Sequence, residues 1–195
     1  MSYIQFDKKQ LVNLSYSLGK EVIRSNKSGA YASTTISGCN TRRYHGLLVA
    51  PQKNISGVHV IISTLDETIM SANASFDLGV HKYPKIYDPK GYKYLRDFVA
   101  EPIPKSTYRL GQDVVLTKEK LLVEHENRTL VRYILEEARE PVRLRLKPFL
   151  AFRNVHTLMK ANEQLNKQTE AISQGIKLRL YDGYEDLYVQ FSEEA

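Results

Sequence analysis

The chain has one cysteine, no tryptophan and no long apolar run, and these absences exclude several classes of protein. Cys39 alone can form neither an intramolecular disulfide nor a multi-cysteine metal site. No stretch approaches the roughly 18 apolar residues of a membrane-spanning helix, so we expect no membrane partner. The N-terminal MSYIQFDKKQ has neither the apolar core nor the cleavage site of a secretory signal, which predicts a cytoplasmic location.

Clustered positive charge is also missing, although the formal net charge is +6. Basic residues alternate with acidic ones, as in LTKEKLLVEHENR, and the three cations of VRLRLK are typical of a solvated strand face. Proteins that bind nucleic acid through phosphates need Lys and Arg gathered on one face. We therefore expect no nucleic-acid partner.

Metal and cofactor motifs are absent from the sequence as well. The five histidines, at positions 45, 59, 81, 125 and 156, have no spacing typical of metal ligands. The glycines form no Gly-x-Gly-x-x-Gly or phosphate-loop pattern. We predict no metal site and no cofactor.

No pair of carboxylates is suited to glycoside hydrolysis, which needs two carboxyl groups facing one sugar. Asp66 and Glu67 are adjacent, and neighbouring side chains on a strand point to opposite faces. Glu124 and Glu126 share a face but alternate with apolar residues, as solvent-facing positions do. Cys39 has no base nearby in the sequence, so we interpret it as a small, partly buried residue near a turn. We predict no catalytic residue in this chain.

Alternation of apolar and polar residues with a period of two dominates from residue 57 onward and predicts an all-β fold, an antiparallel β-sandwich with few or no long helices. The predicted strands are 57–65, 66–72, 75–83, 94–102, 114–126, 128–138 and 141–152. Residues 176–191 predict a hairpin that turns at Asp182-Gly183. Its core-facing residues would be Leu178, Leu180, Leu187, Val189 and Phe191.

The polar segment between the last two predicted elements, 156–173, is poor in β-branched residues, so we expect a loop or a short helix there. Residues 1–195 show no internal repeat and no obvious linker, which predicts a single β-sandwich domain. A sandwich with this many long strands usually continues. The chain therefore either closes its domain here or is part of something larger.

The most distinctive segment is GAYASTTISGCNTRRYHGLLVAP, residues 29–51. A turn flanked by Gly38 and Gly46 gathers planar donors and aromatic rings that can hold sugar hydroxyls or pair with carboxylates. The candidate residues are Asn40, Thr41, Arg42, Arg43, Tyr44 and His45. If a strand begins at Gly46, the side chains just before it project from the end of the sheet.

This segment closely resembles the N-terminal signature of archaeal and bacterial glycogen debranching enzymes, the amylo-α-1,6-glucosidases. STLDE, SFDLGVHKYP, YLRDFVAEPIPKSTY and LKPFLAFRNVHTL follow in the same order as similar motifs of that family. Arg153 and His156 fall where the family has R-D-x-H, with Asn154 in place of the Asp. The resemblance adds Arg153 and His156 to the candidate substrate-binding or domain-interface residues.

The resemblance implies a galactose-mutarotase-like β-supersandwich that packs on a C-terminal (α/α)6 toroid, which would carry the catalytic carboxylates. The chain would then be the non-catalytic N-terminal domain of a glycoside hydrolase that acts on an α-glucan, glycogen or a branched oligosaccharide. Its partners would be that C-terminal catalytic domain and the glucan. The alternative is a stand-alone carbohydrate-binding or structural β-module.

Overall fold

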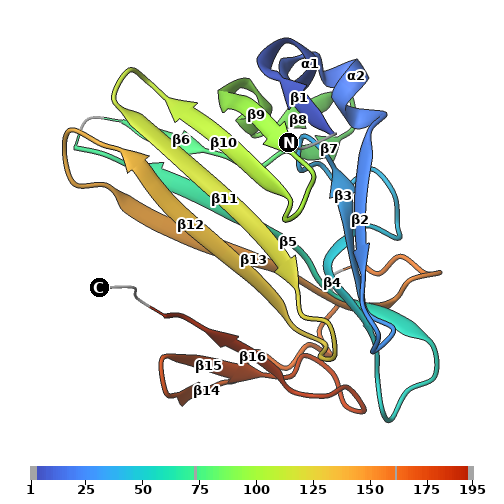
Figure 1. The fold of residues 1–195 in the computed structure, drawn as a ribbon. Helices are drawn as coiled ribbons and strands as arrows, with labels where there is room; N and C mark the ends of the chain where they lie inside the picture. The colour runs from blue at the N-terminus through green and yellow to red at the C-terminus, as the bar shows by residue number, and fades with distance from the viewer. Residues whose placement is uncertain (1–3, 73, 161, 193–195) are drawn as a thin grey trace.

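The structure is a computed structural model that describes residues 4–72, 74–160 and 162–192, and it confirms the predicted all-β sandwich (Figure 1). One layer, sheet A, is antiparallel and five-stranded, in the order β1-β9-β10-β11-β12. Its strands are β1 (Gln5–Asp7), β9 (Leu95–Val99), β10 (Lys105–Leu110), β11 (Val114–Leu122) and β12 (Thr129–Glu137). β10 was not predicted from the sequence.

The other main layer, sheet B, has the order β13-β5-β4-β3-β2, with β6 paired to β5. Its strands are β2 (Glu21–Ser25), β3 (Tyr31–Thr35), β4 (Gly46–Pro51), β5 (Val58–Met70), β6 (Ser75–Asp77) and β13 (Arg143–Asn154). The division of 57–72 into two strands was wrong, because β5 continues through Leu65 and Asp66. Pairing with β13 extends from Met70 to His59 along nearly the whole of β5, and register shifts in β13 absorb the irregularity.

Two smaller sheets complete the fold. One contains β14 (Thr169–Ile172), β15 (Gly175–Leu178) and β16 (Leu187–Gln190), and the other pairs β7 (His81–Tyr83) with β8 (Ile86–Asp88). The predicted C-terminal hairpin is confirmed: β15 and β16 are antiparallel, and Gly183 adopts a φ of 84° between them. Phe191 is 54% exposed and does not join the core as predicted, because it lies beyond the end of β16.

The helices are short, as expected. α1 (Lys8–Val12) begins at a capping box in which Asp7 and Gln10 each accept a hydrogen bond from the other's backbone amide, both at 2.9 Å. The side chain of Asn13 caps α2 (Leu14–Leu18), and a 3₁₀ helix, η1 (Gly91–Tyr94), precedes β9. In the described ranges, no helix is long and apolar enough to cross a bilayer.

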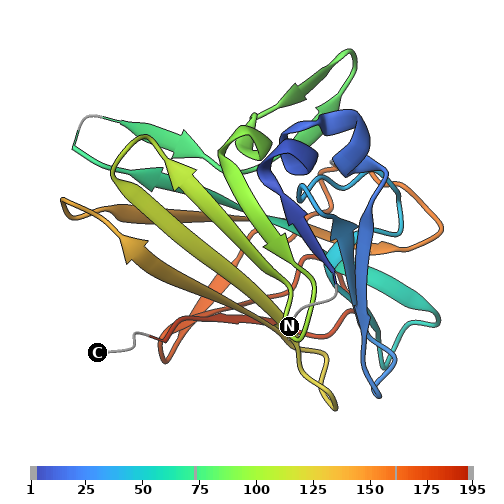
Figure 2. The same cartoon turned by 45° about the horizontal axis from the view of Figure 1, so that its top comes forward.

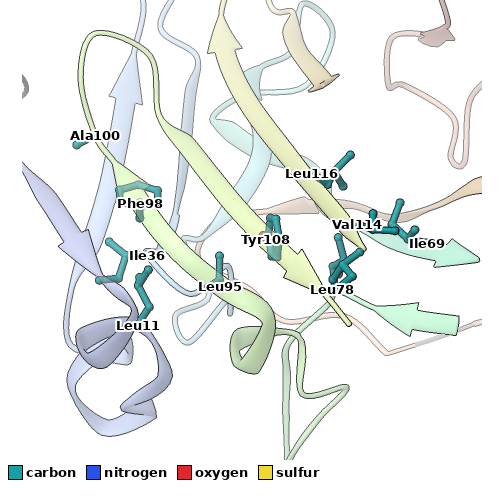
Figure 3. Packing of buried hydrophobic residues seen from close by; sticks show 11 residues of the cluster. Leu11, Ile36, Ile69, Leu78, Leu95, Phe98, Ala100, Tyr108, Val114 and Leu116 are labelled. Atoms are coloured by element: carbon teal, nitrogen blue, oxygen red, sulfur yellow. The ribbon is translucent and has the colours of Figure 1, made fainter. Parts of the chain in front are cut away.

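The largest apolar cluster lies on the inner side of sheet A. Figure 3 shows Leu11 and Ile36 near Phe98 at one end of it, and Leu78 and Ile69 at the other. Burial of one such side chain contributes about 1.5–3 kcal/mol to folding. A second cluster joins sheet B to the β14–β16 sheet, which lies below β12 and β13 in Figure 1 and at the lower left of Figure 2. Its buried members are Ala30, Leu48, Ala50, Ile61, Phe152, Leu178 and Leu187.

Candidate functional site

The turn between β3 and β4 has the predicted boundaries. β4 begins at Gly46, which is buried. A Cβ atom at this position would lie 2.6 Å from Cγ2 of Val49 and 3.2 Å from the carbonyl oxygen of Ile62, so a larger residue would push the turn off β5. Gly46 therefore sets how closely the turn approaches the sheet.

The first half of the turn is tied to the protein interior. The Thr35 hydroxyl donates to the carbonyl of Cys39 at 2.9 Å and accepts from its amide at 3.0 Å, and Asn40 Nδ2 donates to the carbonyl of Ser63 at 2.9 Å. Cys39 is fully buried, and burial raises the pKa of its thiol to about 11. Because the thiolate is the reactive form, Cys39 has a packing role, in agreement with the sequence interpretation.

The side chain of His45 lies under the turn and contacts its backbone. Its side chain is 2% exposed, and Nδ1 accepts a hydrogen bond from the Thr41 amide at 3.2 Å. Nε2 lies 3.5 Å from Glu21, which also forms an ion pair with Arg42. Burial lowers the pKa of His45, and the carboxylate of Glu21 only partly opposes this effect. His45 does not project from the end of the sheet as expected, because its ring fills the space under the turn.

Arg43 and Tyr44 do project outward, and they meet the segment that follows β13. Arg43 Nη1 donates to the carbonyl of His156 at 3.1 Å, and the Tyr44 hydroxyl lies 3.3 Å from His156 Nδ1. The Tyr44 and His156 rings pack edge to face at 5.7 Å, and the Arg43 guanidinium lies 5.0 Å from the Tyr44 ring centroid. We call Arg43, Tyr44, Arg153 and His156 the turn surface.

Arg153 holds the two halves of the turn surface together. Its guanidinium donates to the carbonyls of Arg43 and Thr157, and to that of its neighbour Asn154. The Asn154 side chain in turn accepts from the His156 amide at 2.9 Å, which fixes the position of that residue. Partial burial lowers the pKa of Arg153.

The structure therefore gathers all eight candidate residues at the turn before β4 and the segment at the end of β13, in two layers. Asn40, Thr41 and His45 form the inner layer, while Arg42 extends to Glu21 at the edge strand. Tyr31 was missed; its hydroxyl donates to the carbonyl of Tyr44 at 2.9 Å. Nothing in the local sequence predicts this contact.

Leu158 and Met159 directly follow the turn surface in the chain and were also missed. They are 77% and 44% exposed, high values for apolar side chains. The segment was predicted only as a loop or a short helix because it is mostly polar. The exposure of these two apolar side chains was therefore not predicted.

The carboxylates of β5 are engaged on opposite sides of sheet B, as predicted. Glu67 is 2% exposed, accepts from Tyr133 at 2.6 Å and forms an ion pair with Lys118. Asp66 instead pairs with His81, with 2.7 Å between Oδ2 and Nε2. Burial disfavours the ammonium of Lys118, but the neighbouring carboxylate of Glu67 outweighs this effect and raises the pKa of Lys118 above its usual value. Neither carboxylate is available as half of an acid–base pair. Among the described residues, no three His, Cys, Asp or Glu side chains gather as metal ligands.

Comparison with known proteins agrees with the motifs of the turn. Residues 20–195 match the family described as glycogen debranching enzyme N terminal. No curated protein and no solved structure gives a significant match. Because the match covers the turn surface and every strand from β2 to β16, the chain belongs to the glycogen debranching enzyme N-terminal domain family.

Proposed function

We propose that this chain is the non-catalytic N-terminal domain of an amylo-α-1,6-glucosidase and that residues 1–195 act as one unit. Its turn surface supports a C-terminal (α/α)6 catalytic domain of the same protein. Family membership favours a larger, multidomain enzyme, and the engaged state of Asp66 and Glu67 favours catalysis by groups outside this chain. A cytoplasmic location stays a prediction.

The observation that carries the proposal is the exposed contact between Tyr44 and His156. Tyr44 is 38% exposed, and both rings lie outside the apolar clusters of the domain. Two hydrogen bonds join the two segments, one from Arg43 to the carbonyl of His156 and one from Arg153 to the carbonyl of Arg43. A rigid surface that contributes little to its own core is typical of a binding site.

The chemistry of the surface fits a protein partner that carries a carboxylate. Arg43 has one hydrogen bond to a carbonyl, and its guanidinium forms no ion pair in the described part of the chain. A guanidinium has five N–H donors and binds carboxylates in a bidentate manner. Leu158 and Met159 add an exposed apolar rim, which favours a protein interface.

Direct contact with the α-glucan is the second candidate function. The exposed ring of Tyr44 lies beside the donors of Arg43 and the imidazole of His156. Such a combination of an aromatic face and planar donors suits sugar rings and hydroxyls.

The test is co-purification of the 195-residue chain with the separately expressed catalytic domain, using Tyr44→Ala and His156→Ala. Both variants should lose association at least tenfold. Arg128→Ala removes an exposed arginine paired with Glu126 and serves as the matched control, which should bind normally. Unchanged association in both variants contradicts the interface.

Retarded migration of the isolated chain in glycogen-containing gels, abolished by Tyr44→Ala, would instead support the glucan contact.

A further inference from the structure

A cavity of about 70 Å³ lies between sheets A and B. β4 pairs with β3 only as far as Ser33 opposite Gly46, so no strand separates the end of β3 from the middle of β5. The cavity occupies this gap and extends to Lys118 and Lys120 on β11. A water molecule needs about 10–15 Å³, so the space holds about five waters or one small tetrahedral ion.

The wall of the cavity is unusually polar for the interior of a sandwich. Hydroxyl side chains line it from four strands and the turn after β3; they are Ser33, Thr34, Thr35, Ser37, Ser63, Thr64, Ser106 and Thr129. Three buried wall atoms have no hydrogen-bond partner within the described residues: Thr34 Oγ1, Thr64 Oγ1 and Asn40 Oδ1. Buried polar atoms are nearly always paired, and the two threonine hydroxyls can donate, so they favour an occupant that accepts hydrogen bonds.

Two cations of the wall lack a carboxylate. Arg24 donates only to the carbonyls of Ile23 and Ala100, and Lys120 has no side-chain hydrogen bond or ion pair in the ranges described. Of the two acidic residues in the wall, Glu67 pairs with Lys118, which also lines the cavity, and Asp66 pairs with His81, which does not. Arg24 and Lys120 therefore lie next to hydroxyl donors without a carboxylate partner among the described residues.

This arrangement lowers the pKa of Lys120. Burial and then the neighbouring ammonium of Lys118 lower the pKa of Lys120 to about 7, and Glu67 opposes this only weakly. Tyr108 and Arg24 are the other titratable groups on the cavity wall, together with Asp66. A desolvated ammonium without a partner is costly, and a bound anion would remove that cost.

We propose that this cavity binds a phosphate group, with Lys120 and Arg24 as its charged partners and the hydroxyls of Thr34 and Thr64 as donors. The occupant is either free inorganic phosphate or the phosphate of a monoester whose remainder lies in the mouth of the cavity. This site is separate from the turn surface and does not depend on its role.

The experiment is isothermal titration of the full chain with inorganic phosphate at pH 7, with ionic strength held constant by KCl. Lys120→Met should reduce the affinity at least tenfold while keeping the fold, because the half-buried Lys120 side chain has no hydrogen bond or ion pair among the described residues to lose. Lys93→Met removes an exposed lysine outside the cavity and should bind like the wild type.

Glucose 6-phosphate and glucose are titrated in parallel. Tighter binding of the ester than of the ion assigns the site to monoesters, and the reverse assigns it to the free ion.

A second measurement keeps the proposal testable if Lys120→Met does not fold. Saturating phosphate should raise the pKa of Lys120 by at least one unit in the wild type, as followed by NMR of the lysine side chains. The proposal is overturned if neither phosphate nor the ester binds, if Lys93→Met and Lys120→Met lose affinity equally, or if phosphate leaves the Lys120 titration unchanged.

Discussion

The Tyr44 hydroxyl lies 3.3 Å from Nδ1 of His156, although 112 positions separate the two residues in the chain. This contact joins the turn before β4 to the segment after β13, and both segments lie within the part of the chain that matches the debranching-enzyme family. The contact is exposed and is held by hydrogen bonds from neighbouring residues. Substitutions at this surface can therefore distinguish a binding role from a purely structural role.

Arg43→Ala should leave the melting temperature of the isolated domain nearly unchanged, because the side chain is exposed and has one hydrogen bond to a carbonyl. In the full-length protein, the same change should lower glucan turnover or domain association at least tenfold, since it removes a desolvated charged contact. Differential scanning calorimetry and activity measurements on one preparation decide the matter. A clear loss of stability, with activity falling only in proportion, would show that Arg43 merely fixes its own loop.

Glu67→Ala should lower the free energy of unfolding by about 3–5 kcal/mol, because it leaves Lys118 buried without its counter-charge. Urea denaturation gives this difference directly. Glu126→Ala is the control, since it breaks the exposed pair with Arg128 and should cost less than about 1 kcal/mol. Similar losses in both variants would argue against a special role for the buried pair.

Stability should fall as the pH drops below about 6.5, the ordinary pKa of histidine, because burial lowers the pKa of folded His45. The unfolded chain then binds a proton that the folded chain resists, so the contribution is complete above that pH and is lost as the pH falls toward the folded pKa. His45→Gln should flatten this part of the urea-derived stability profile. His125→Gln changes an exposed histidine and should not. Parallel profiles for the wild type and His45→Gln would contradict the assignment.

The purified chain should release no glucose from α-1,6-branched glucans. Its β5 carboxylates are engaged by His81, Lys118 and Tyr133, and Glu124 and Glu126 are exposed and paired with basic residues. Glucose-release assays on repeatedly purified protein test this expectation. Turnover that persists through purification and disappears with a point substitution in this chain would show that a catalytic pair was overlooked.

The sequence by itself determined the class of fold and the position of the turn. Alternation of side chains fixes which residues share a face of a strand, so it predicted the sheets and the opposite orientations of Asp66 and Glu67. Turn chemistry placed the bend at Gly183 and the start of β4 at Gly46. These are local properties, which depend on a residue and its near neighbours.

Only the tertiary structure decided which segments meet. Alternation does not specify strand order. It therefore could not predict that Tyr44 contacts His156 or that Lys118 pairs with Glu67. It also could not show that His45 lies under the turn, since its burial depends on Glu21 and the edge strand. The cavity at Lys120 likewise exists because β4 begins at Gly46 and leaves β3 and β5 apart. These features depend on long-range pairing, and its energetics are distributed over whole sheets and not encoded in any single motif.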